Sequence, residues 1–153
     1  MVAVQELGHA VLYVRDVDRS SKFYGDVLGW TPIMRPDLQV RAAAFSGGRT
    51  HHELLLIEVG EDAAAIPRGR RVGLYHLGLK IGDSDDDLRE MLVRLQQHPD
   101  LVTIVGSADH NVSHSLYVLD PDGNEIELFV DDLSIDWRND PDAFAQPVRP
   151  LKL

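Results

Sequence analysis

The sequence lacks cysteine, long apolar runs and any concentration of positive charge. With no cysteine among 153 residues, neither a disulfide framework nor a thiolate metal site can form, and a reducing cytoplasm is the expected location. No stretch of about 18 uncharged apolar residues occurs, and the first residues show no leader pattern, so we expect no membrane span and no targeting segment. A net charge of -10 disfavours nucleic acid and anionic lipid as partners. We therefore expect a small-molecule partner, and any bound metal must use nitrogen and oxygen ligands.

The overall composition is that of a folded protein. Apolar residues make up 44% of the chain and charged residues 26%, an ordinary globular balance. A length of 153 residues lies near the commonest size for one compact unit. We expect residues 1–153 to form a single domain.

The sequence contains an internal duplication. Residues 7–16, LGHAVLYVRD, align with residues 74–83, LYHLGLKIGD, so that His9 matches His76 at a separation of 67 residues. Each of these segments has the pattern of a short strand, in which side chains alternate between two faces. The two histidines are therefore expected at equivalent positions of two similar modules.

Each copy is predicted to run strand, helix and then three strands. Asp16 or Asp18 can cap the first helix and Gly29 can end it, while Ser84 and the aspartates that follow can begin the second helix. Strands after the helices are expected at residues 39–45, 53–59, 101–105, 115–119 and 125–130. The predicted fold class is α+β, with two βαβββ modules in tandem that form a curved mixed sheet around a metal site. The modules are expected at about 5–60 and 73–131, with a linker at about 60–72 and an irregular tail at 132–153.

A carboxylate in the last predicted strand completes a candidate ligand set. Glu127 shares one face of that strand with Glu125 and Phe129. Burying a glutamate is unfavourable unless a cation compensates its charge. Two neutral imidazoles and one carboxylate leave other coordination positions open, which suits iron(II). We predict that His9, His76 and Glu127 bind a divalent metal.

A longer motif carries a family resemblance. Residues 110–128, HNVSHSLYVLDPDGNEIEL, closely resemble the extradiol dioxygenase signature, although Ala108 departs from the usual pattern just before it. The matching residues are His110, Leu116, Tyr117, Asp120, Pro121, Gly123 and Glu127. Over nearly its whole length, the chain resembles the vicinal-oxygen-chelate superfamily of glyoxalases, extradiol dioxygenases and bleomycin-resistance proteins, and it is most similar to the catechol 2,3-dioxygenase-like branch.

The resemblance also implies catalytic residues. Residues 51–56, HHELLL, are similar to the paired-histidine strand of ring-cleaving dioxygenases, which implies that His52 is the acid–base residue. By the same resemblance, His110 and Tyr117 would contact the substrate oxygens. The better-known extradiol enzymes carry four such modules and this chain has two, so the match is to their catalytic half or to a one-domain version.

The expected function is extradiol cleavage of a catechol-like aromatic, as part of aromatic compound catabolism. The expected metal is Fe(II), with Mn(II), Zn(II) or Ni(II) as alternatives, and the expected partners are a small aromatic substrate, dioxygen and further copies of this chain in a homodimer or higher homo-oligomer. Two other functions stay open: a glyoxalase-like lyase or epimerase that uses Zn, Ni or Co, and a protein that binds an antibiotic without catalysis. In the lyase or epimerase, Glu53 would face inward in place of His52, since one β-bulge would exchange them. His51 and His114 are candidates for the mouth of the site.

Overall fold

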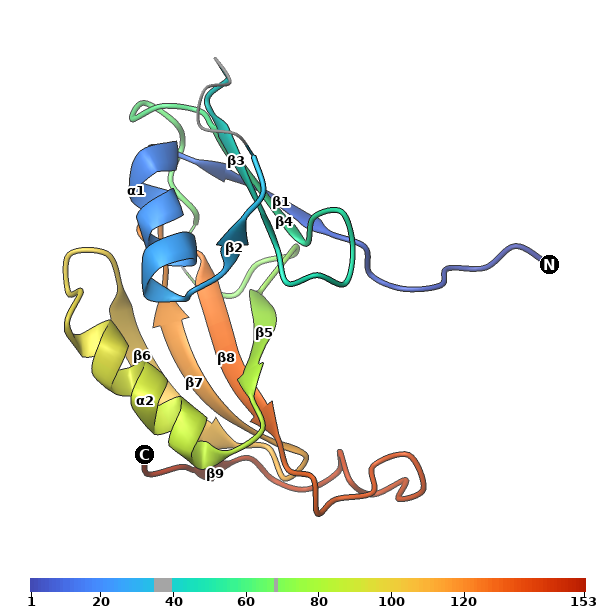
Figure 1. Ribbon diagram of the computed structural model, residues 1–153. Coiled ribbons are helices and arrows are strands. Elements are labelled where there is room, and N and C mark those ends of the chain that lie inside the picture. The colour runs from blue at the N-terminus through green and yellow to red at the C-terminus, as the bar shows by residue number, and fades with distance from the viewer. Residues whose placement is uncertain (35–39, 68) are drawn as a thin grey trace. The chain divides into compact units, whose positions relative to one another are not determined.

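The computed structural model describes residues 1–34, 40–67 and 69–153 (Figure 1). The chain folds as two units, Met1–Ala65 and Ile66–Leu153, and each unit has its own β-sheet. Residue 39, where a strand was expected to begin, and residue 68 in the expected linker lie outside the described residues. Among the helices of the described residues, none is long and apolar enough to cross a membrane.

Unit 1 contains the first βαβββ module. Its elements are β1 (Ala10–Val14), α1 (Val17–Ser21), η1 (Lys22–Val27), β2 (Thr31–Pro32), β3 (Ala42–Ser46) and β4 (Leu54–Glu58). The strand order is β1-β4-β3-β2, with β1 parallel to β4 and the other pairs antiparallel. Side chains alternate along β1 as expected of a strand: Leu12 and Val14 are buried in the core, and Val11 and Tyr13 are exposed.

The helical segment of unit 1 begins as predicted and then widens. The Asp16 side chain accepts hydrogen bonds from the backbone N–H groups of Asp18 and Arg19, so Asp16 is the N-cap. The second half, η1, is a π-helix, a feature that the sequence pattern did not predict. Its last bond runs from the N–H of Leu28 to the carbonyl of Phe23, five residues earlier, at 2.9 Å. Gly29 ends the segment with φ at 77°, a conformation that favours glycine.

Unit 2 repeats the same topology. Its elements are β5 (His76–Gly82), α2 (Asp85–Gln96), β6 (Thr103–Asp109), β7 (Ser113–Leu119), β8 (Glu125–Asp131) and β9 (Arg149–Pro150). The order β5-β8-β7-β6 matches β1-β4-β3-β2, and β5 is parallel to β8 as β1 is to β4. The prediction of an α+β fold with tandem βαβββ modules is therefore confirmed. The tail is not wholly irregular, because β9 pairs with β6 and gives hydrogen-bond partners to that edge of the sheet.

α2 starts at the predicted acidic cap. The Asp87 carboxylate accepts hydrogen bonds from the N–H groups of Asp83 and Ser84, both at 3.0 Å, and from the Ser84 hydroxyl at 2.8 Å. Gly82 leaves room for this carboxylate, since a Cβ at that position would lie 2.4 Å from Asp87 Oδ2. The helix buries Leu88, Met91 and Leu95. Figure 1 shows α2 lying along the sheet of unit 2.

The pairing of β7 with β8 determines which side chains share a face of this sheet. Leu116 pairs with Leu128, and both are buried on the face that α2 covers. The neighbouring pair, Tyr117 and Glu127, therefore points to the opposite face. The turn between the two strands is closed by Asp120, whose carboxylate accepts hydrogen bonds from the backbone N–H groups of Asp122 and Asn124.

Candidate active site

Glu127 is the central carboxylate of unit 2. Its side chain is only 16% exposed. Oε1 accepts hydrogen bonds from the hydroxyl of Ser115 at 2.6 Å and from the phenol of Tyr117 at 2.9 Å. Oε2 lies 3.0 Å from Nε2 of His76. One oxygen of the carboxylate is therefore held by two hydroxyl groups, and the other faces an imidazole nitrogen.

The geometry of His76 and Glu127 fits two ligands of one metal ion. Ligand atoms about 2.1 Å from a metal and at right angles to each other are about 3.0 Å apart, which is the separation of His76 Nε2 and Glu127 Oε2. Nδ1 of His76 is buried and has no hydrogen-bond partner among the described residues. Oε1 of the Glu125 carboxylate lies 3.6 Å from this Nδ1 atom. A neutral imidazole and a carboxylate are donors that divalent metals of the first transition row accept.

A hydrogen-bonded chain connects His110 to this carboxylate. Nε2 of His110 lies 2.7 Å from the phenol oxygen of Tyr117, which donates its single proton to Glu127. We infer that Nε2 of His110 carries a proton and donates it to the phenol oxygen. Burial, together with the adjacent Glu127 carboxylate, raises the pKa of Tyr117 well above its ordinary value. Tyr117 therefore stays protonated and remains a donor.

Unit 1 gathers three histidines. The metal-ligating atoms of His9, His51 and His52 all lie within 4.8 Å of one another. His9 stands just before β1, and its ring centroid is 4.4 Å from that of His52. Burial and the neighbouring imidazoles of His9 and His51 lower the pKa of His52, an effect that Glu53 partly opposes. The lowered pKa favours the neutral imidazole of His52, which is the form that can accept a proton.

Glu53 is engaged in the turn between β3 and β4. Its Oε2 accepts a hydrogen bond from the N–H of Gly47 at 2.8 Å, and its Oε1 accepts from the N–H groups of Arg49 and Thr50, both at 3.0 Å. Burial raises the pKa of Glu53, but the hydrogen bonds from Gly47 and the rest of the turn outweigh this effect and lower the pKa overall. Both carboxylate oxygens thus close a turn.

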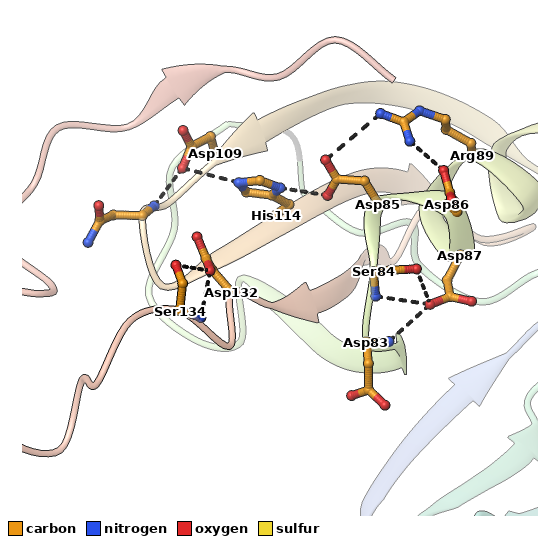
Figure 2. A network of polar contacts seen from close by, with 11 residues as sticks. Asp83, Ser84, Asp85, Asp86, Asp87, Arg89, Asp109, His114, Asp132 and Ser134 are labelled. Atoms are coloured by element: carbon orange, nitrogen blue, oxygen red, sulfur yellow. Dashed lines mark hydrogen bonds and ion pairs between the residues drawn. The ribbon is translucent and has the colours of Figure 1, made fainter.

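His114 does not lie with the other predicted residues of unit 2. It is next to Ser115 on β7 and pairs with Val130, so it points to the α2 side of the sheet. Its Nδ1 lies 2.6 Å from Oδ1 of Asp85 in the first turn of α2, and its Nε2 lies 3.7 Å from Oδ1 of Asp109 (Figure 2). The prediction that His114 lines the mouth of the site is therefore wrong. Its contacts connect α2 to the sheet.

Each unit thus brings its own predicted residues together. Unit 2 assembles His76, His110, Tyr117 and Glu127, and unit 1 assembles His9 and His52 with His51. Ser115 is a residue that sequence reasoning missed. It shares the strand face of Tyr117, two positions away, and this shared alternation is the signal that could have indicated it.

Comparison with known proteins gives the family. The family model described as the Glyoxalase/Bleomycin resistance protein/Dioxygenase superfamily matches residues 6–128. The chain is 35% identical over 134 residues to a catechol-2,3-dioxygenase of Bacillus subtilis (strain 168), covering 88% of this chain and 44% of that protein. It is 30% identical over 129 residues to a biphenyl-2,3-diol 1,2-dioxygenase of Paraburkholderia xenovorans (strain LB400), covering 80% and 40%.

The chain therefore spans less than half the length of these two dioxygenases. Among solved structures, the crystal structure of a lactoylglutathione lyase from Agrobacterium tumefaciens superposes with a TM-score of 0.58 at 28% identity, covering 80% of this chain and 91% of that one. The relatives thus include two kinds of enzyme. The extent of the family match shows that this chain belongs to the Glyoxalase/Bleomycin resistance protein/Dioxygenase superfamily.

Proposed function

We propose that the protein is a metal-dependent extradiol dioxygenase that uses dioxygen to cleave the ring of a catechol-like aromatic. In this proposal His76 and Glu127 bind a divalent metal, and His9, at the equivalent position of the first copy, supplies the third ligand. The 3.0 Å separation of His76 Nε2 and Glu127 Oε2 supports the pair as ligands. The duplication supports His9, which lies 67 residues before His76.

The observation that carries the proposal is the use of Glu53 in the β3–β4 turn. In a lyase or epimerase with Glu53 as fourth ligand, the oxygen that bound the metal would give up its backbone hydrogen bonds, which number one at Oε2 and two at Oε1. A backbone N–H group that is withdrawn from water and left without a hydrogen-bond acceptor is energetically unfavourable. Among the described residues, His52 makes no such turn-closing bonds, and its lowered pKa favours the neutral imidazole. The segment just before β4 therefore offers a base in His52 more readily than a ligand in Glu53.

Each residue then has a role that its environment supports. A bound iron(II) ion would supply Lewis acidity and open coordination positions for the substrate oxygens and dioxygen. Neutral His52 would accept a proton from a substrate hydroxyl. Tyr117, whose phenol oxygen is held by His110, donates its single proton to Glu127 in this structure; on substrate binding it would turn that proton to a substrate oxygen and orient the ring. Iron(II) is proposed over Mn(II), Zn(II) or Ni(II) because two histidines and one carboxylate with open positions are the ligand set of non-haem iron(II) oxygenases.

A second candidate function is a glyoxalase-like lyase that uses Zn, Ni or Co. The Agrobacterium tumefaciens lyase supports it, because the match covers 91% of that chain whereas the matches to the dioxygenases cover less than half of theirs. The two candidates differ in the role of Glu53 and in the need for dioxygen. They can be separated by one set of assays.

The test is oxygen uptake by metal-free protein that has been reloaded anaerobically with iron(II) and mixed with a panel of catechols. We expect catechol-dependent uptake that falls by about 10²–10⁴-fold in His52→Ala, the range typical of a lost general base. His98→Ala, which removes a histidine just beyond α2, is the matched control and should keep the wild-type rate. Absence of uptake with every catechol, together with conversion of a glutathione hemithioacetal by the zinc- or nickel-loaded protein, would favour the lyase.

A further inference from the structure

Ser115 is a buried polar side chain beside the candidate ligand Glu127. Its exposed fraction is 0%, and it lies in the middle of β7, between Ala108 on β6 and Phe129 on β8. Its hydroxyl donates a 2.6 Å hydrogen bond to Oε1 of Glu127 and also contacts the phenol of Tyr117. A buried hydroxyl requires a partner, and a carboxylate is a strong one.

The two oxygens of Glu127 have different surroundings. Oε1 accepts hydrogen bonds from Ser115 and Tyr117, so its lone pairs are directed at hydroxyl groups. Oε2 lies beside Nε2 of His76. A carboxylate that rotated, or that bound a metal through both oxygens, would lose the bond to the buried hydroxyl. Ser115 thus favours one orientation of the carboxylate.

We propose that Ser115 is a positioning residue, whose hydroxyl holds Oε1 of Glu127 so that Oε2 alone is presented to the metal beside His76. This inference rests on the proposed metal site. Tyr117 cannot fill the same role, because its phenol is shared with His110 and would also have to reach the substrate. Ser115 is fully buried, so its hydroxyl stays with the carboxylate in the presence or absence of substrate.

A purely structural role for Ser115 predicts something different. If the strand needed only a small side chain between Ala108 and Phe129, alanine would serve as well as serine. If the hydroxyl positions Glu127, alanine should weaken metal binding, while threonine, which keeps the hydroxyl, should largely restore it. The contrast between Ser115→Ala and Ser115→Thr therefore separates the two roles.

The experiment is a titration of the metal-free full chain with Co(II), followed by the visible absorption of the bound ion and run without substrate. Loss of a side chain that orients a ligand typically weakens metal binding about 10–100-fold, and we expect this for Ser115→Ala together with an altered Co(II) spectrum. Ser113→Ala is the matched control, on the same face of β7 and two residues away, and should bind Co(II) within about twofold of wild type.

Each outcome bears on a different part of the proposal. If the wild type binds no Co(II), both the metal site and the role of Ser115 are wrong. If the wild type binds Co(II) and Ser115→Ala binds it equally well with the same spectrum, only the role of Ser115 is wrong. If Ser115→Thr is as weak as Ser115→Ala while both retain the wild-type circular dichroism, side-chain size matters and the hydroxyl does not, which also overturns the inference.

Discussion

Replacing Tyr117 with phenylalanine removes the hydroxyl that connects His110 to Glu127 and nothing else. A hydrogen bond to a charged group contributes about 1.5–3 kcal/mol. Oε1 of Glu127 keeps its bond from Ser115, and His110 is 29% exposed, so its nitrogen can bond to water instead. We therefore expect Tyr117→Phe to lower the free energy of unfolding by about 1.5–2 kcal/mol, the lower part of that range. For a chain of this size the melting temperature should fall by about 3–8 °C.

The assay is thermal unfolding of the metal-free wild type and variant across pH. Because the pKa of Tyr117 is raised above its ordinary value of 10.0, its stabilising contribution is complete below pH 10 and is lost as pH rises toward the folded-state pKa. The difference between the two proteins should be constant from pH 7 to 9 and should shrink above pH 10. An equal or higher melting temperature for the variant at pH 7 would refute the reasoning, since the phenol would then contribute nothing to the network.

Two further predictions concern carboxylates outside the metal site. Glu53→Gln should weaken the β3–β4 turn, because the amide keeps one acceptor oxygen and turns its NH2 group toward the N–H of Gly47 or toward those of Arg49 and Thr50. Thermal unfolding should show a lower melting temperature, and a Co(II) titration should show unchanged affinity. Hydrogen bonds from Ser84 and Asp83 lower the pKa of Asp87, so its contribution to stability is present above its ordinary value of 3.8 and is lost as pH falls through the lower folded-state pKa. Asp87→Asn should therefore reduce stability at pH 7 and show less further loss during acid unfolding than the wild type, as followed by circular dichroism.

The duplication made most of the fold predictable. An alternating strand next to an acidic helix start, repeated 67 residues later, defined two βαβββ modules, and the structure gives both the same strand order. The βαβββ pattern implied a strand corresponding to β2, but its bounds were not predicted, and β9 was not predicted at all, because two residues are too few to show alternation. The π-helical turn of η1 was missed because its apolar spacing also fits an α-helix.

The candidate site was predictable where strand alternation applies. Tyr117 and Glu127 lie opposite each other on β7 and β8. The same alternation places His114 on the other face of the sheet, but the prediction for His114 did not take the alternation into account. The role of Glu53 could not be read from the sequence. It depends on backbone N–H groups that converge only when residues 47–50 form their turn, in which Gly48 adopts a φ of 93°.

The most direct test of the proposed function is the fate of dioxygen in a single reaction. Iron(II)-loaded protein is mixed with a catechol under ¹⁸O₂, and the ring-opened product is analysed by mass spectrometry beside a Glu127→Ala control. The wild type should incorporate both atoms of dioxygen into the product, and the control, which lacks a proposed ligand, should form none. Unlabelled product, or equal product from Glu127→Ala, would contradict the claim that this site is the metal centre of an extradiol dioxygenase.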